Sequence, residues 1–234
     1  ITVKGTNDAP VATFTGSESA TEDDISIGGT LSASDSDSSD TLSFQLLGSD
    51  IPGLTISSDG TWSFDPSNAA YQGLANGESQ TITVNYGVSD NNGALAQNSF
   101  SINLTGSNDA PVATFSTAQA VSEGTNNLIG QLSATDSDSS DTLTYSFSGN
   151  NTIDGLTINS DGSFSFDASV EAYNSLANDE TQEITVDYSV TDNNGATSTN
   201  SFVITVKGTN DAPVATFTGS ESATEDDISI GGTL

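Results

Sequence analysis

The sequence contains no cysteine, no histidine and no methionine, and it has only 2 basic residues. Without Cys and His it can form no disulfide, no ordinary structural zinc site and no thiol nucleophile. Against those 2 bases stand 32 acidic residues, which gives a formal net charge of -30. Surfaces that bind nucleic acid or anionic lipid need clustered Lys and Arg. The composition therefore excludes nucleic acid as a partner and argues against adhesion to an anionic membrane.

Long apolar runs are also missing. No run approaches the roughly 18 residues of a membrane-spanning helix, so we expect no membrane insertion by this segment. The apolar residues that are present are regularly spaced and rich in Ile, Val, Phe and Tyr. Disordered chains lack both properties, so we expect a folded protein.

The sequence repeats itself. Residues 1–31 recur without a change at 204–234, and INLTGSNDAPVATF at 102–115 is a diverged copy of the start of the chain. A repeat of about 100 residues is the usual size of one small domain. We therefore expect a segment of a longer array. Its predicted parts are the end of a preceding repeat plus linker (1–9), a first unit (10–107), a second unit (108–210) and the incomplete start of a third (211–234).

Within each unit, short runs of alternating apolar and polar residues are separated by turn residues. This spacing is typical of an antiparallel β-sandwich, because alternation gives each strand one buried face. The fold prediction is all-β, with tandem immunoglobulin-like sandwiches of about seven strands arranged as a linear rod. The strands expected in the first unit are Val11–Phe14, Ile25–Ala33, Leu42–Leu46, Leu54–Ile56, Trp62–Phe64, Ile82–Val88 and Phe100–Leu104.

One segment carries a helical signal. Asp65 can cap a helix and Pro66 suits its first position, which predicts about two turns that end near Gly77. Tyr71 in this segment, and the equivalent Tyr173, are expected to close one end of the core. Trp62 lies in an alternating strand pattern and is likewise expected in the core.

The acidic motif DSDSSD occurs twice, at 35–40 and at 136–141. Alternate connections of an antiparallel sandwich fall at opposite ends, so this loop should share one end with DNNG at 90–93 and with the linker NDAP at 7–10. Glu22 to Asp24 and Glu78 should lie at the other end. Where two units meet, the ends converge. The residues expected at that joint are Glu22, Asp24, Glu78, Asn108, Asp109, Asp136, Asp138, Asp141 and Asp192.

So many acids in one place need a counter-charge. Two carboxylates about 5 Å apart repel by roughly 3 kcal/mol at an effective dielectric of 20. With almost no Lys or Arg, that charge must come from outside the chain. Carboxylate and amide oxygens without His or Cys favour calcium over zinc or copper, and calcium accepts six to eight irregular ligands. The loops are thus predicted to hold Ca²⁺.

Each motif also has a purely structural interpretation. NDAP can be an Asx-turn linker, and DSDSSD can be a solvated loop; it differs from an EF-hand loop, which has a central Gly and a terminal Glu. Asn92-Gly93 and its equivalent Asn194-Gly195 are good hairpin turns. We interpret Asp59-Gly60 and Asp161-Gly162 as turns only.

The motif ITVKGTNDAPV, the acidic loop and the pattern around TITVNYGVSDNNGA resemble the VCBS-type, cadherin-like repeats in the extender region of giant RTX-type bacterial surface adhesins. The resemblance covers essentially the whole chain. It implies calcium at the linkers between domains, type I secretion and a location on the bacterial cell surface. The Asn-Asp pairs of the linkers match the calcium pattern of that family, as do Glu22 and Glu123. The second unit departs from the first by placing Gly124 and Thr125 where the first has Asp23 and Asp24.

These arguments together give one set of candidate calcium ligands. The set comprises Asn7, Asp8, Glu22, Asp24, Asp35, Asp37, Asp40, Glu78, Asp90, Asn108, Asp109, Glu123, Asp136, Asp138, Asp141, Glu180, Asp192, Asn210 and Asp211.

Three functions compete. The first is a structural extender whose repeats are made rigid by calcium and partner one another through calcium joints. The second is an adhesive module that recognises a glycan or associates with other adhesin fibres through calcium; this requires exposed aromatic anchors or matching acidic surfaces. The third, an enzyme, requires acids that face each other across a cleft, whereas these acids lie in turns at the domain ends. We expect no enzymatic activity.

Overall fold

The computed structural model describes residues 1–149, 152–216, 219 and 224–225, and within them it has eighteen β-strands and no helix. The strands of the first unit are β1 (Val11–Ala12), β2 (Ser17–Thr21), β3 (Ile27–Thr30), β4 (Ala33–Ser34), β5 (Ser43–Leu46), β6 (Leu54–Ile56), β7 (Thr61–Phe64), β8 (Ser79–Ser89) and β9 (Leu95–Thr105). Those of the second unit are β10 (Val112–Ala113), β11 (Gln119–Ser122), β12 (Leu128–Gln131), β13 (Ala134–Thr135), β14 (Thr144–Phe147), β15 (Leu156–Ile158), β16 (Ser163–Phe166), β17 (Thr181–Thr191) and β18 (Thr197–Lys207).

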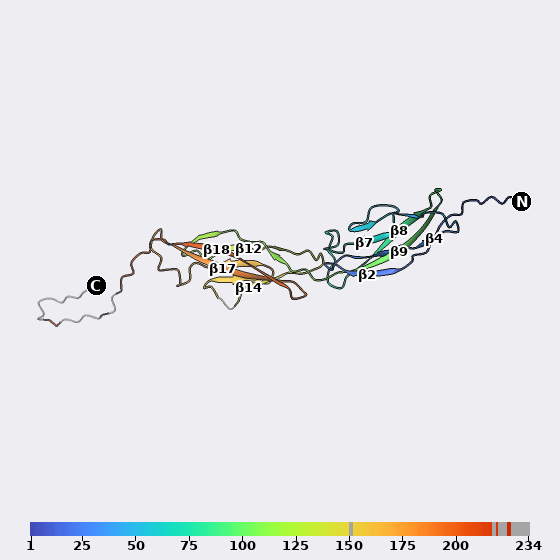
Figure 1. The fold of residues 1–234 in the computed structure, drawn as a ribbon. Coiled ribbons are helices and arrows are strands. Elements are labelled where there is room, and N and C mark those ends of the chain that lie inside the picture. The colour runs from blue at the N-terminus through green and yellow to red at the C-terminus, as the bar shows by residue number, and fades with distance from the viewer. Residues whose placement is uncertain (150–151, 217–218, 220–223, 226–234) are drawn as a thin grey trace.

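The two units have the same topology. In the first, a four-stranded sheet in the order β2-β9-β8-β5 packs against a three-stranded sheet in the order β3-β7-β6, and β1 pairs with β4. The second repeats this arrangement with β11-β18-β17-β14, β12-β16-β15 and β10-β13. Figure 1 shows the two sandwiches end to end, which confirms the all-β tandem prediction.

A long hairpin is the centre of each core, β8–β9 in the first unit and β17–β18 in the second. Alternate residues of β8, including Val84, Tyr86 and Val88, are fully buried, as the alternation in the sequence predicts. The Tyr86 hydroxyl donates a hydrogen bond to the Phe14 carbonyl at 2.8 Å, so this buried phenol is satisfied. Trp62 is also buried, with its ring 5.0 Å from that of Phe100, which confirms its place in the core.

The first expected strand, Val11–Phe14, is shorter in the structure, and the strand after it, β2, was not expected. Val11–Ala12 forms β1 beside β4, and the chain then crosses to the other sheet as β2, which runs parallel to β9. The sequence of β2, SESAT, has no apolar alternation, and only Ala20 in it is buried. Its main contacts are backbone hydrogen bonds, so hydrophobic pattern does not reveal it. The second expected strand divides into β3 and β4.

The predicted helix between Asp65 and Gly77 is wrong. The segment is a chain of separate turns, closed by hydrogen bonds from Asn68 N to the Asp65 carbonyl at 3.4 Å and from Tyr71 N to the Asn68 carbonyl at 3.0 Å. The Asp65 carboxylate also accepts from the N–H of Ser67 at 3.1 Å. Asp and Asn side chains that capture nearby backbone N–H groups compete with helix formation. The prediction for Tyr71 is confirmed, because it is buried against Phe64 with ring centroids 5.4 Å apart.

The ends of the chain make few strands. Residues 1–9 form no strand and are all exposed, and residues 211–216 form no strand either. Most of the predicted third repeat, 211–234, lies outside the described residues. The glycines of the four expected turns, Gly60, Gly93, Gly162 and Gly195, all have positive φ, which a turn at these positions requires.

Candidate metal centres

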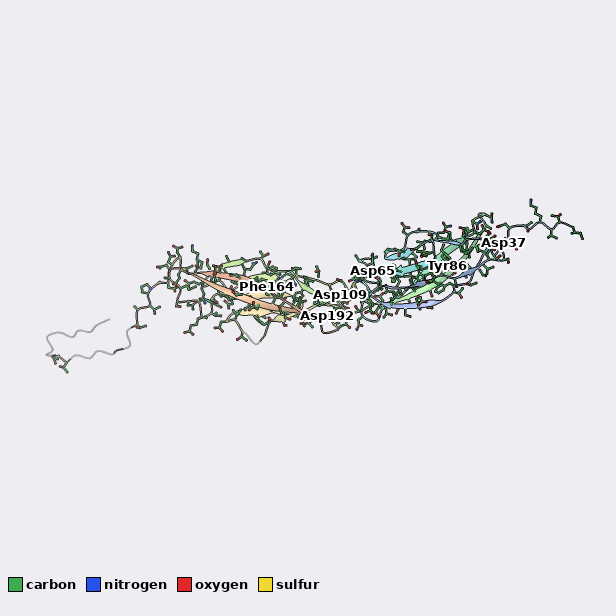
Figure 2. All side chains as sticks on the ribbon, viewed as in Figure 1. Asp37, Asp65, Tyr86, Asp109, Phe164 and Asp192 are labelled. Carbon is green, nitrogen blue, oxygen red and sulfur yellow. The ribbon has the colours of Figure 1, made fainter. Side chains whose placement is uncertain are left out.

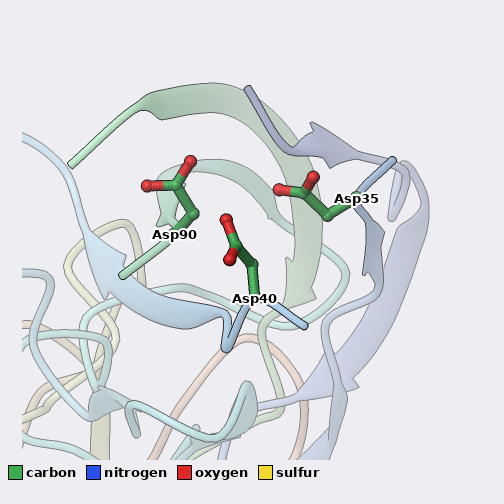
Figure 3. A group of neighbouring side chains, drawn as sticks. All are labelled: Asp35, Asp40 and Asp90. Carbon is green, nitrogen blue, oxygen red and sulfur yellow. The ribbon is translucent and has the colours of Figure 1, made fainter. Parts of the chain in front are cut away.

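The first acidic loop lies at the N-terminal end of the first unit. Asp35 follows β4, Asp40 closes the loop and Asp90 follows β8, so three segments far apart in sequence meet there. Each offers a carboxylate oxygen, and these oxygens lie within 4.8 Å of one another. Figure 3 shows the three side chains around a common space. We call Asp35, Asp40 and Asp90 the first-unit cluster.

Local hydrogen bonds shape the loop. The Asp35 carboxylate accepts from the N–H of Asp37 at 2.9 Å, and the Asp37 carbonyl accepts from the N–H of Asp40 at 2.9 Å. These bonds are an Asx turn followed by a β-turn, which is why Asp and Ser recur at this spacing. The turns direct the carboxylates toward one side of the loop.

The linker is tied to the same cluster. Asn7 Nδ2 donates to the Asp90 carboxylate at 2.8 Å, and the N–H of Asp8 donates to the Asp37 carboxylate at 2.8 Å. The Asx-turn interpretation of NDAP is therefore incomplete, because the linker also contacts two loops of the sandwich.

Asp90 organises the hairpin turn that follows β8. Its carboxylate accepts from the N–H groups of Asn92 and Ala94, each at 2.9 Å. The hydrogen bond from Asn7, together with these backbone donors, lowers the pKa of Asp90. Asn92 Nδ2 in turn donates to Asp40 at 2.9 Å. Asn92 thus joins the cluster, although we predicted it only as a turn residue.

The second unit builds the same arrangement at the joint, the region where the two units meet. Carboxylate oxygens of Asp136, Asp141 and Asp192 lie within 4.8 Å of one another. Asn108 Nδ2 donates to Asp192 at 2.9 Å, and the N–H of Asp109 donates to Asp138 at 2.9 Å. Figure 2 shows Asp109 and Asp192 between the two sandwiches.

Glu22 reaches the joint from the first unit. It follows β2 and is only 1% exposed. Its Oε1 accepts from the N–H of Ser107 at 2.9 Å. Burial, with the charges of Asp138, Asp23 and Asp109, raises the pKa of Glu22. Acids of both units therefore act on one another at the joint.

The carboxylates of the linker and of the second-unit loops fall into two groups, those with a raised pKa and those with a lowered pKa. Burial, followed by charge repulsion from neighbouring acids, raises the pKa of Asp109 and of Asp138. Burial alone would also raise the pKa of Asp192, but hydrogen bonds from Asn108 and from three backbone N–H groups outweigh it and lower that pKa. Asp192 is thus a satisfied anion, whereas Asp109 and Asp138 lack enough positive partners.

The oxygens without a partner test whether a cation fits. Among the described residues, five buried side-chain oxygens at the joint accept no hydrogen bond. They are Glu22 Oε2, Asn108 Oδ1, Asp109 Oδ2, Asp136 Oδ2 and Asp138 Oδ1. Buried polar atoms are almost always paired, and a set of hard oxygens from several segments suits calcium. The residues present therefore fit a Ca²⁺ site.

The two units also contact each other directly. The Ser139 hydroxyl donates to the Gly73 carbonyl at 3.1 Å, and Asn76 Nδ2 lies 3.4 Å from Asn194 Oδ1. Both contacts are exposed, so each contributes little to holding the units at a fixed angle.

The end of the second unit opposite the joint, here called the far end, carries Glu123. Glu123 is buried, and its Oε1 accepts from the N–H and the hydroxyl of Thr209, while Oε2 is unpartnered. In the linker that follows, Asn210 Nδ2 donates to the Asp211 carbonyl at 3.3 Å. Glu123 corresponds to Glu22, and the linker residues Asn210 and Asp211 correspond to Asn108 and Asp109.

Three predicted ligands stand apart from these groups. Glu78 and Glu180 are exposed, and each accepts a hydrogen bond from the backbone of its own turn, at Ala75 and Ala177. Asp24 is exposed beside Ile25, on a shallow hollow bordered by β2 and β3. No contact found in the described residues joins these three side chains to the clusters.

The described residues include no helix long and apolar enough to cross a membrane. A family model for the bacterial cadherin-like domain matches residues 7–106 and again residues 108–208. A search of curated proteins found no match.

Solved structures share the fold at low sequence identity. The two-domain EC1-2 fragment of human protocadherin-24 is 19% identical, with 88% of this chain and 100% of that chain covered and a TM-score of 0.55. The EC22-24 fragment of mouse cadherin-23 is 18% identical, with 87% and 66% covered and a TM-score of 0.52. The EC1-2 fragment of human mucin-like protocadherin is 16% identical, with 86% and 98% covered and a TM-score of 0.52.

Proposed function

The chain belongs to the bacterial cadherin-like domain family, of which it carries two tandem copies, and we propose that it is a calcium-rigidified extender of a secreted bacterial surface adhesin. In this role the product of the array is length and stiffness, and binding domains elsewhere in the adhesin are held away from the cell. The repeats partner one another through calcium at their joints.

The observation that carries the proposal is the make-up of the joint. Glu22 comes from one sandwich, Asn108 and Asp109 from the linker, and Asp136 and Asp138 from the other sandwich, and each has a buried oxygen with no partner. A cation bound by these groups is bonded to both units at once. Such a bond fixes the angle between units, whereas an acidic linker without it flexes and extends by self-repulsion.

The proposed ligands fall into three sets. At the joint, Glu22, Asn108, Asp109, Asp136 and Asp138 are joined by the carboxylates of Asp141 and Asp192. The first-unit cluster with Asn7, Asp8 and Asp37, and the far end with Glu123, Asn210 and Asp211, are the matching parts of further joints. Asp24, Glu78 and Glu180 stay predictions. When bound, calcium supplies positive charge and flexible coordination by oxygen.

The chemistry suits an extracellular location. Modules outside the cell use calcium sites with dissociation constants of about 0.1 to 1 mM, which are empty at cytosolic calcium levels. Because calcium binds the folded, docked state, it also stabilises that state by linkage. We propose that the repeats complete their folding after type I secretion. A chain that is fully folded and rigid in chelator would contradict this step.

Adhesion by the repeats themselves has less support. Trp62 is buried, so it cannot serve as the exposed aromatic anchor that glycan recognition favours. Calcium-mediated association between fibres remains the alternative, and a monomeric sedimentation profile in calcium would argue against it.

The test of the proposed function is calcium titration of the full chain by isothermal calorimetry, with thermal unfolding in calcium and in chelator. We expect saturable calcium binding and a higher melting temperature in calcium. Magnesium is the control, because it requires shorter and more regular coordination and should bind more weakly. No binding heat together with an unchanged melting temperature would overturn the proposal.

A further inference from the structure

Asp23 has a backbone conformation that few residues other than glycine adopt. It lies in the turn after β2 with a φ of 65°, in the left-handed region that glycine favours. The equivalent residue of the second unit is Gly124, with a φ of 73°. The same turn is therefore made with glycine at the far end and with a strained aspartate at the joint. Strained residues of this kind concentrate at functional sites.

The Asp23 side chain faces the joint. Its Oδ2 accepts a hydrogen bond from the Ser107 hydroxyl at 3.1 Å, and the N–H of the same Ser107 donates to Glu22 at 2.9 Å. The charge of Asp23 also acts on Asp109, where it adds to burial in raising the pKa of that acid. Asp23 is thus close to acids of both the first unit and the linker.

The far end lacks this arrangement. The hydroxyl of Thr209, which corresponds to Ser107, donates instead to Glu123 at 3.1 Å. The one other described non-glycine residue with positive φ is Asp179, whose carboxylate forms an ion pair with Lys207 at 2.7 Å. Thr105 stands at the position of Lys207 in the first unit. The joint therefore carries the charge of Asp23, which the far end lacks, whereas the charge of Asp179 at the far end is neutralised by Lys207.

Two buried oxygens indicate that a cation site lies beside Asp23. Glu22 is 1% exposed and Asp138 is 2% exposed, and each has one oxygen without a hydrogen-bond partner. The charges of Asp23 and of Asp138 both act on Glu22, so the three acids lie in one group. A carboxylate placed there adds negative charge where positive charge is already missing, which raises the affinity of an oxygen site for calcium.

We propose that Asp23 is an additional calcium-binding group of this joint, one that the far end lacks. The inference rests on the proposed function. Residues 204–234 repeat 1–31, so the far end leads into a copy of the start of the first unit. A joint completed there by a further acidic loop has Gly124 in place of Asp23, and we expect it to bind calcium more weakly than the joint between the two units.

The experiment is calcium titration of the full chain carrying Asp23→Gly or Asp23→Asn. Glycine fits the positive φ, and asparagine keeps the shape while removing the charge. The matched control is Asp179→Gly, which removes one charge and relieves one positive φ outside the joint. We expect both Asp23 variants to weaken the tightest calcium step about tenfold, because affinity follows the ligand charge count. The control should keep the wild-type affinity.

Thermal unfolding gives a second readout. In chelator, Asp23→Gly should melt at the wild-type temperature or above it, because it removes repulsion and strain. Addition of calcium should raise the melting temperature of this variant less than it raises that of the wild type. Wild-type calcium affinity in both Asp23 variants would overturn the inference while leaving the proposed function intact. Absence of calcium binding by the wild-type chain would instead overturn the proposed function.

Discussion

Acids at the joint differ in how many hydrogen-bond donors their carboxylates have. Asp192 accepts hydrogen bonds from three consecutive backbone N–H groups, from Asn194 to Ala196, so its negative charge is stabilised without any ion. Glu22 has one donor for two buried oxygens. The first kind of acid builds the loop, and the second kind has an oxygen that the proposed calcium ion would bind. The same residue types thus have two roles, which depend on local donors.

The first prediction concerns Glu22→Gln. The amide oxygen can still accept from Ser107, but the negative charge is lost. In calcium we expect a lower melting temperature than wild type, with a cost of about 3 kcal/mol or less, because a buried ligand is gone. In chelator we expect a higher melting temperature than wild type, because the variant lacks the disfavoured buried charge. Differential scanning calorimetry checks both. A change of the same sign in both conditions would contradict the role of Glu22 as a ligand.

The second prediction is the pH dependence of that variant in chelator. The folded-state pKa of Glu22 is raised, so its ionisation costs stability above that pKa, and the cost disappears as the pH falls through it. The advantage of Glu22→Gln over wild type should therefore be largest near neutral pH and should shrink in acid, as wild-type Glu22 becomes protonated. An advantage that does not depend on pH would show that charge is not its cause.

At the level of elements, Gly106 connects the core to the joint. It follows β9 and lies against the backbone of the turn before β8, where an added Cβ would be 2.3 Å from the carbonyl oxygens of Leu74 and Ala75. The next residue, Ser107, donates to both Glu22 and Asp23. The positions of Glu22 and Asp23, the proposed ligands, therefore depend on close backbone packing at one glycine.

The third prediction follows from this packing. Gly106→Ala should destabilise the chain by about 1 to 3 kcal/mol, because backbone atoms must move to admit the methyl group. It should also weaken calcium binding by displacing Ser107. Gly73→Ala is the control, because its Cβ meets only Ser137 at an ordinary 3.7 Å. Urea unfolding and calorimetry measure the two effects, and equal behaviour of the two variants would refute the argument.

The sequence predicts elements well where burial determines them. The alternation in β8 and the turn at Gly93 follow from local chemistry, and both occur as expected. Strand β2 could not be predicted in this way, since its polar residues are held by parallel pairing with β9. The helix predicted after Asp65 failed because its Asp and Asn side chains capture the backbone N–H groups.

The candidate site was partly predictable from the repeated motifs. Repetition of DSDSSD and of the Asn-Asp linker indicates which acids converge, and the structure brings together those of the loops, the linkers and Glu22. The sequence did not predict Asp23 as a ligand, because the second unit has Gly124 at the equivalent position and this argues against a shared role. Its left-handed backbone, visible only in the structure, gives the opposite indication.

At the scale of the whole molecule, the charge of -30 is the central fact. One ion pair, Lys207 with Asp179, occurs in the described residues, so the chain neutralises almost none of this charge itself. Figure 1 shows that the units meet only at their ends, and the direct contacts there are exposed hydrogen bonds. In the proposed function, the stiffness of the array therefore depends on calcium bound by the acids at the joint.

The most direct test of that claim is the distribution of distances between the two units. The chain has no native cysteine, so Ser58→Cys and Ser160→Cys, at equivalent exposed positions, can carry one spin label each. Pulsed electron double resonance would then compare millimolar calcium with excess chelator. We predict one narrow distance in calcium and a broad distribution in chelator, with Glu22→Gln intermediate. A distribution equally narrow in both conditions would contradict the account.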